Sequence, residues 1–324
     1  MAAPAYVTPG EAVVPEEEFM ITPDAKLEEV ADGVFAYLQL PGSWCLNNAG
    51  FLVGSPEGDT VLIDTAATET RARALRETVV ATCGRMPGLL VNTHHHGDHT
   101  YGNHLFTPHA RVISHPRCRE EILRNGLDLP ALWPDVVWGD IVVTPPSATY
   151  TDRLTLHTPA YDIELIHPGV AHTAGDTAVW LPEQKVLFAG DLIFSEGTPF
   201  VFMGSVTGSI DALGLLRELG AETVVPGHGP VCGPEVYDTV ERYLMWIRGL
   251  AEEGRAAGIA PREVALEADL GEFAALGEPE RLVMNLHRAY AELDGVPGGD
   301  PLPFPAALAD AITCNGGLPP VCNA

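Results

Sequence analysis

Basic residues are scarce in this chain: only two of its 324 residues are lysines, Lys26 and Lys185. Acidic residues outnumber Lys and Arg by 44 to 18, which gives a formal net charge of −26. A surface this acidic repels phosphate backbones, so we expect no nucleic acid partner. No stretch approaches the ~20 consecutive apolar residues that cross a bilayer, so we expect no membrane partner either.

Other signals are also missing. The six cysteines include no Cys-x-x-Cys pair, which argues against a disulfide framework and against a zinc ribbon. No Gly-x-Ser-x-Gly sequence is present, so a serine nucleophile on a sharp turn is not expected. The first 20 residues contain no Lys or Arg and no apolar core, so no signal peptide is visible and we expect a cytoplasmic protein.

The length and composition are those of an ordinary globular protein of the α/β class. Apolar residues make up 46% and charged residues 19% of the chain. We divide it into an extended N-terminal arm (residues 1–25, with four prolines), a catalytic domain (26–250), and a helical extension with a tail (251–324).

One segment, residues 92–103, carries most of the chemical information. It reads Asn-Thr-His-His-His-Gly-Asp-His-Thr-Tyr-Gly-Asn and follows an apolar strand candidate. Alternate residues of an extended segment point to the same side, so His94 and His96 can hold one metal ion while His95 faces away. If the chain turns at the glycine into a helix, Asp98 and His99 can reach a second metal ion.

The motif His94-x-His96-x-Asp98-His99 resembles the signature of the metallo-β-lactamase-fold superfamily. This resemblance implies an αββα sandwich with a one- or two-metal site at the edge between its sheets. It also implies further ligands from downstream loops, and this sequence has a matching residue for each of them. These are His172 in Gly-Val-Ala-His-Thr-Ala-Gly-Asp, Asp191 after a buried strand, and His228 in Pro-Gly-His-Gly-Pro.

By the same resemblance, His172 completes the first metal site, His228 joins the second, and Asp191 bridges the two. Asp64 stands at a strand end where the family often keeps a carboxylate that orients a ligand histidine. A helix N-terminal cap is an equally good interpretation of Asp64, and both roles are compatible.

Two divalent cations fit this inventory, with zinc expected and manganese or iron(II) as alternatives. Such a pair lowers the pKa of a shared water and supplies a bridging hydroxide near neutral pH. We expect a hydrolase of an ester, lactone, thioester or amide bond, in which Asp98 also carries the proton to the leaving group. A phosphodiesterase or sulfatase on the same site, or a di-iron oxidoreductase, is the alternative.

Aromatic residues near the candidate metal ligands predict an apolar substrate pocket formed by Trp44, Trp133, Phe194 and Phe200. Similar lactonases place a tyrosine three residues after the bridging aspartate, whereas this chain has Phe194. We therefore expect a neutral or hydrophobic small-molecule substrate. The tail has few charges and several apolar residues, which favours packing on its own core or a homodimer.

Overall fold

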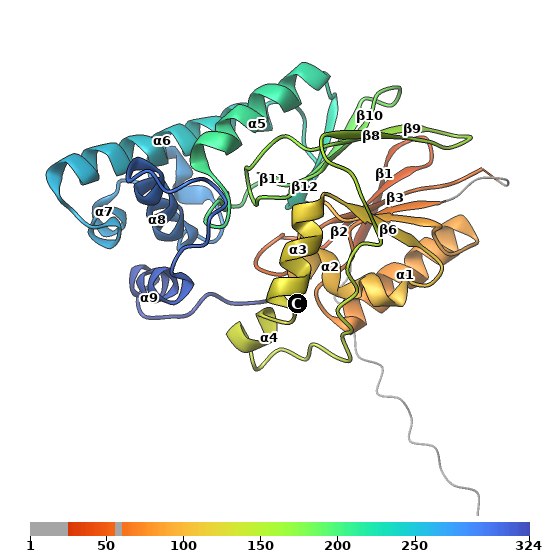
Figure 1. Cartoon of the computed structure of the whole chain (residues 1–324), viewed down its shortest axis with the longest axis horizontal. Coiled ribbons are helices and arrows are strands. Elements are labelled where there is room, and N and C mark those ends of the chain that lie inside the picture. Colours follow the sequence, from red (N-terminus) through yellow and green to blue (C-terminus); the bar gives the residue numbers. More distant parts are fainter. Residues whose placement is uncertain (1–24, 56–59) are drawn as a thin grey trace, which may run out of the picture.

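Two β-sheets form the centre of the protein (Figure 1). The computed structural model describes residues 25–55 and 60–324, so the arm predicted for residues 1–25 lies almost wholly outside the described residues. The first sheet has seven strands in chain order. They are β1 (Lys26–Ala31), β2 (Val34–Leu38), β3 (Ala49–Leu52), β4 (Val61–Ile63), β5 (Leu89–Val91), β6 (Arg111–Ser114) and β7 (Ala148–Thr149). Strands β1 to β4 pair antiparallel, and β5 to β7 continue from β4 in parallel.

The second sheet has five strands in the order β12-β11-β10-β9-β8. They are β8 (Arg153–His157), β9 (Asp162–Ile166), β10 (Ala178–Leu181), β11 (Val186–Phe194) and β12 (Thr223–His228). All neighbours pair antiparallel except β11 and β12, which run in parallel. The carboxyl ends of β11 and β12 therefore meet at one edge of the sheet, where Asp191 and His228 are placed.

The sheets pack face to face because their strands alternate inward and outward side chains. On β2, Val34, Ala36 and Leu38 point into the apolar layer that both sheets share. Phe35 and Tyr37, on the opposite side of the same strand, pack in a separate cluster with α1 (Glu69–Cys83). One sheet thus buries both of its faces.

Helices cover the outer faces of both sheets (Figure 1). Helix α1 begins at Thr68, whose hydroxyl accepts from the Arg71 amide, and ends at Gly84 with φ 70°. Helices α5 (Val206–Leu219) and α6 (Val236–Ala257) pack on the second sheet. Shorter helices follow the strands of the first sheet. They are α2 (Gly97–Thr100), η1 (Tyr101–Leu105), α3 (Pro116–Asn125) and α4 (Leu129–Leu132).

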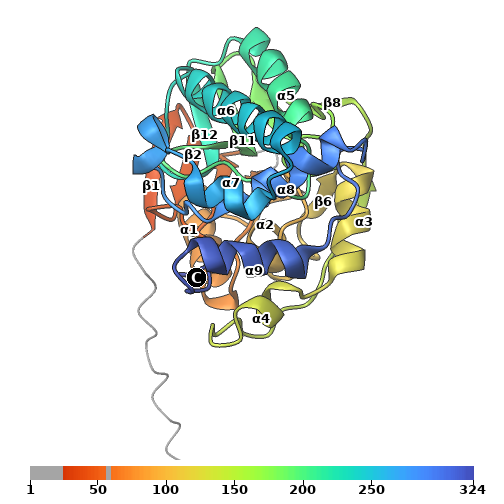
Figure 2. The ribbon, with the colours of Figure 1, turned by 90° about the vertical axis from the view of Figure 1, so that its left-hand side faces the viewer.

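The C-terminal extension is helical and packs on the rest of the chain. It comprises α7 (Pro261–Glu267), η2 (Gly271–Ala275), α8 (Arg281–Leu293) and α9 (Phe304–Cys314). Helix α8 packs on α6, and α9 crosses near α8 and α4 (Figure 2). The Gly- and Pro-rich composition after residue 294 gave no indication of α9. No helix in residues 25–55 or 60–324 is long and apolar enough to cross a membrane.

Candidate metal centre and substrate cavity

The motif loop is fixed at both ends by a pair of asparagines. The Asn92 side chain donates to Asn103 Oδ1 at 3.1 Å, and Asn103 donates back to Asn92 Oδ1 at 2.8 Å. Between them the chain bends over residues 93–95 and reaches His96, which has φ −60° and ψ 146° and directly precedes α2. The strand-turn-helix order predicted from the sequence is therefore present. It lets His94 and His96 face one part of the site, while Asp98 and His99 face another part.

The first group of ligand atoms comes from three segments of the chain, two loops and strand β11. His94 Nε2 and His172 Nε2 each lie 3.0 Å from His96 Nδ1. Asp191 Oδ2 lies 3.8 Å from His94 Nε2 and 3.4 Å from His172 Nε2. These four atoms lie within 4.8 Å of one another, close enough to share one metal ion.

The second group stands beside the first. His228 Nε2 is 3.3 Å from Asp98 Oδ2, and His99 Nε2 is 3.8 Å from the same oxygen. The Asp191 carboxylate reaches this group as well, with Oδ1 3.1 Å from His99 Nε2 and Oδ2 3.4 Å from His228 Nε2. Asp191 therefore lies between the two groups, as a bridging ligand must.

Hydrogen bonding within this cluster is incomplete in a way that fits metal ions. His99 Nε2 and Asp191 Oδ1 are buried and have no hydrogen-bond partner among the described residues. Orphaned polar atoms of this kind are costly, and coordination to a cation satisfies both of them. The donor set of imidazole nitrogens and carboxylate oxygens is one that zinc and related cations accept.

The electrostatics of the cluster lead to the same conclusion. Burial lowers the pKa of His228, but the carboxylates of Asp191 and Asp98 outweigh burial and raise it to about 9. Burial also lowers the pKa of His99, and Asp191, Asp64 and Asp98 together hold it well above its ordinary value. The carboxylates thus create a site that demands positive charge, either as protons or as metal ions.

Asp64 orients two of the candidate ligands. His99 Nδ1 donates to Asp64 Oδ2 at 2.8 Å. The Thr93 amide and hydroxyl both donate to the same carboxylate, and the hydroxyl lies 3.0 Å from His94 Nδ1. The alternative role of Asp64 as a helix cap is wrong, because Thr68 caps α1.

The two downstream histidines are oriented by backbone carbonyls. His172 Nδ1 donates to Phe200 O at 2.5 Å, and His228 Nδ1 donates to Gly42 O at 3.0 Å. Each ring therefore directs its Nε2 toward the cluster. This arrangement fixes the tautomer that a metal ligand needs.

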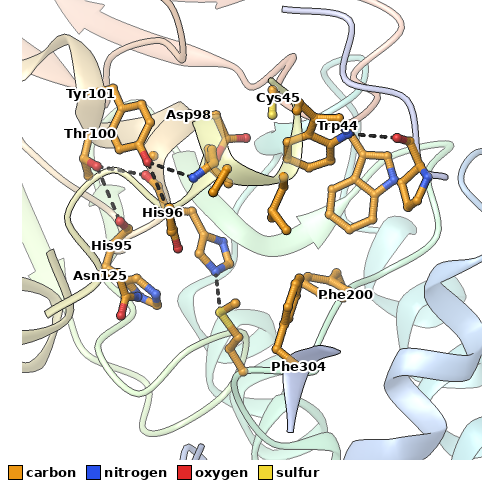
Figure 3. Close-up of a pocket in the computed structure, with 18 of the residues that line it drawn as sticks. Trp44, Cys45, His95, His96, Asp98, Thr100, Tyr101, Asn125, Phe200 and Phe304 are labelled. Carbon is orange, nitrogen blue, oxygen red and sulfur yellow. Dashed lines mark hydrogen bonds between the residues drawn. The ribbon is translucent and has the colours of Figure 1, made fainter. Parts of the chain in front are cut away.

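A cavity of about 570 Å³ opens beside the cluster (Figure 3). Its lining includes all four predicted pocket residues, Trp44, Trp133, Phe194 and Phe200. Trp44 packs edge-on against Phe200 with ring centroids 5.3 Å apart, and it packs tilted against Trp133 at 5.9 Å. Asp98 faces the same cavity, so a substrate bound there has access to both ligand groups.

Two elements of the site were missed by sequence reasoning. Arg281, at the start of α8, lines the cavity although only 1% of its surface is exposed. Its guanidinium lies 4.3 Å from the Trp44 ring centroid and 5.0 Å from that of Phe194, and it donates to Thr198 O at 2.9 Å. Nothing in the local sequence around Arg281 signals this position, which depends on how α8 packs.

The second missed element is the end of the tail, which lies beside α4 (Figure 1). Pro319 and Pro320 line the cavity. Trp133 Nε1 donates to Pro320 O at 2.8 Å, and Arg71 donates to Asn323 O at 2.8 Å. The tail therefore forms part of the cavity wall, in agreement with the expectation that it packs on its own core.

A family model described as "Metallo-beta-lactamase superfamily" matches residues 42–228, more than half of the chain. The chain belongs to the metallo-β-lactamase superfamily. The matched segment begins just before Trp44 and ends at His228, so α6 to α9 lie outside it.

Solved structures of metallo-β-lactamases share the fold. A metallo-beta-lactamase from Pontibacter korlensis superimposes with a TM-score of 0.57 at 20% sequence identity, covering 68% of this chain and 99% of that one. The αββα sandwich predicted from the resemblance is thereby confirmed.

Two curated relatives of this superfamily member illustrate the range of chemistry. The alpha subunit of 2,4-dinitroanisole O-demethylase from Nocardioides sp. (strain JS1661) is 28% identical over 195 residues, covering 57% of this chain and 54% of that protein. A hydroxyacylglutathione hydrolase from Rhodospirillum rubrum is 34% identical over 149 residues, covering 45% and 47%. This chain spans about half the length of these two relatives.

Proposed function

We propose that this superfamily member is a hydrolase that uses two divalent metal ions to cleave an acyl bond of a hydrophobic small molecule. The observation that carries the proposal is the position of Asp191. Its carboxylate lies within 3.4 Å of ligand atoms from both groups, at one end of a largely apolar cavity. Zinc is the proposed metal, since every candidate ligand offers nitrogen or carboxylate oxygen.

Each residue has a role in this proposal. His94, His96 and His172 hold the first metal, while Asp98, His99 and His228 hold the second. When bound, the cations would lower the pKa of water and polarise the acyl oxygen of the substrate.

Asp98 borders both the ligand cluster and the cavity, and we assign it the additional task of passing a proton to the leaving group. Asp64 and Thr93 hold the imidazoles in place.

The cavity lining favours a neutral or hydrophobic substrate. Trp44, Trp133, Phe194 and Phe200 offer apolar surface, which contributes about 25 cal/mol per Å² buried. The relative that O-demethylates 2,4-dinitroanisole, as its name states, acts on an aromatic compound, which agrees with such a lining. Phe194 cannot supply the phenol that similar lactonases place there, so serving the leaving oxygen would fall to Asp98 and to the cation that Asp98, His99 and His228 would hold.

The alternatives are a phosphodiesterase or sulfatase and a di-iron oxidoreductase, since the same ligands suit those reactions. A phosphate or sulfate ester requires several strong donors. Arg281 is the one Lys or Arg among the cavity-lining residues that the structure describes. It is 99% buried and is held by two aromatic rings and Thr198 O, so little of it is left for a dianion.

A metal analysis combined with a substrate panel tests the proposal. Protein purified without added metal should contain about two metal ions per chain. Asp191→Ala should lose metal from both positions, whereas His228→Ala should empty mainly the second. Ester, lactone and thioester substrates should be turned over at least ~100-fold faster than phosphodiesters, a barrier difference of about 2.7 kcal/mol. If a phosphodiester is turned over faster than every acyl substrate, the acyl hydrolase proposal is wrong and the phosphodiesterase alternative is favoured.

The proposal also includes a cytoplasmic location, which is supported by the free thiols of all six cysteines.

A further inference from the structure

The middle histidine of the motif, His95, is not accounted for by the metal centre. It belongs to neither group of ligand atoms. The sequence predicts that it faces away from the metals, and its ring instead packs against His96 with centroids 4.6 Å apart and borders the cavity (Figure 3). The residue is 8% exposed, and neither ring nitrogen has a hydrogen-bond partner among the described residues.

Two unsatisfied nitrogens on one buried imidazole are unusual, because buried polar atoms nearly always find partners. Each of the histidines assigned to metal binding has another polar atom close to a ring nitrogen, as the distances above record. His95 has none. The missing hydrogen-bond partners of His95 are explained if a bound ligand supplies them.

A second polar side chain, which is partly buried, borders the same cavity. Asn125, the last residue of α3, lines the wall near His95, and its carboxamide makes no hydrogen bond with the described residues. Figure 3 shows the two side chains next to each other in the view. The neighbouring Asp128 differs, because its carboxylate already accepts from Tyr101 at 3.0 Å.

These two groups stand in a cavity whose lining is mainly apolar. Ile122 and Leu129 line the same cavity, and the aromatic rings of Trp44 and Phe200 border it on the side away from His95 (Figure 3). Apolar walls with a few placed polar groups are typical of sites that recognise one functional group of a small ligand.

We propose that His95 and Asn125 form a hydrogen-bonding subsite for an uncharged hydroxyl group of the substrate. The chemistry of the two side chains decides the ligand class. A neutral imidazole and a carboxamide each offer both a donor and an acceptor, and a hydroxyl group complements both.

The inference rests on the proposed function, which it deepens. The proposed substrate is then a hydrophobic acyl compound that carries a hydroxyl group. This hydroxyl group lies at the end of the cavity near His96, away from Trp44. His95 and Asn125 then determine specificity and take no part in the bond cleavage itself. Discrimination by such a site can be strong, since an analogue without the hydroxyl leaves both side chains unpaired.

The test separates binding from turnover by using ligands that the enzyme cannot hydrolyse. Dissociation constants of 2-phenylethanol and its three ring-hydroxylated isomers are measured by ligand-observed NMR titration on zinc-loaded full-length protein. At least one hydroxylated isomer should bind about tenfold more tightly than the parent alcohol, a difference of about 1.4 kcal/mol. The preference should vanish in His95→Phe and in Asn125→Leu, and part of it should survive in His95→Gln, which keeps a donor and an acceptor.

The same exchange at an exposed histidine, His109→Phe, is the matched control and should leave the preference intact. Zinc content and melting temperature are recorded for each variant, because a folding defect lowers binding of all four alcohols equally. Equal affinity of the wild-type protein for all four alcohols overturns the proposal, as does a preference that persists in both His95→Phe and Asn125→Leu.

Turnover of methyl phenylacetate and its ring-hydroxylated derivatives then distinguishes the proposed hydrolase activity from the proposed subsite. If the hydroxyl preference in binding is present but no ester is hydrolysed, the subsite stands and the proposed acyl hydrolysis fails. If all the esters are hydrolysed at the same kcat/KM and binding shows no preference, the hydrolase stands and the subsite fails.

Discussion

Gly227 permits the close approach on which the candidate metal centre depends. It precedes His228 on β12 and lies against the end of β11. A Cβ atom at this position would stand 1.9 Å from Asp191 Oδ1, 2.6 Å from Gly190 C and 2.7 Å from Asp191 N. Two of these three atoms are backbone, so the strands themselves would have to separate in Gly227→Ala.

The size of the effect follows from the distances. Contacts of a Cβ below 3.0 Å are essentially never seen, so the Asp191 carboxylate must withdraw by about 1.1 Å. Metal ligands tolerate deviations of only about 0.2 Å. Asp191 would therefore be lost as a bridging ligand, while the overpacking alone costs about 1–3 kcal/mol of stability. We expect metal content to fall from about two ions to one or fewer and kcat/KM to fall at least ~100-fold, about 2.7 kcal/mol.

Metal analysis of the purified variant and kcat/KM on the best acyl substrate measure both effects. Gly214→Ala is the matched control, since Gly214 lies inside α5 and an added Cβ meets no atom within 4 Å. That change should leave metal content and activity intact and raise stability by up to ~1 kcal/mol. Gly227→Ala protein with a full metal complement and undiminished activity would refute the reasoning, because Asp191 could not then be a ligand in the position described.

Four further predictions concern Asp64, His115, the C-terminal tail and the oligomeric state. Asp64→Asn removes the carboxylate that accepts from His99 Nδ1, so metal affinity measured by competition with a chelator should fall ~10–100-fold. Burial lowers the pKa of His115 to about 4, and its ring accepts from the Arg117 amide at the start of α3. Its contribution to stability is present above its unfolded pKa of about 6.5 and is lost as the pH falls toward 4. In His115→Asn, which keeps a capping side chain, the drop in melting temperature between pH 7 and pH 4.5 should be smaller than in the wild type. Removal of residues 318–324 should raise KM more than it lowers kcat, because this segment forms part of the cavity wall; an unchanged KM would contradict that role. The homodimer expected from the sequence stays a prediction, and light scattering that gives a monomer mass would contradict it.

Much of the metal centre could be anticipated from the sequence because its spacing is local. His94, His96, Asp98 and His99 lie within six residues, and the geometry of a strand followed by a turn and a helix determines which way each one points. The resemblance to a known superfamily then indicated the order of the downstream ligands His172, Asp191 and His228. The matching family model and the similar solved structures confirm the family and the fold.

The role of Asp64 shows where local reasoning stops. Its position at the end of β4 is equally compatible with capping a helix and with orienting a ligand, since both require an acceptor at a strand end. The tertiary fold decides, because parallel pairing of β4 with β5 brings Thr93 and His99 onto the carboxylate. Thr68, four residues further along, caps the helix instead.

The substrate cavity depends still more on tertiary structure. Arg281 and the segment around Pro320 reach it only because α8 and α9 fold back over the end of the second sheet. Side chains that are more than 200 residues apart, such as Trp44 and Arg281, then stack on one another. The sequence by itself determined which residues can bind metal, since that depends on chemistry and short-range spacing. Which side chains surround the metals and remain unpaired, as His95 does, was decided by the packing of distant segments, because burial and partners are properties of the folded chain.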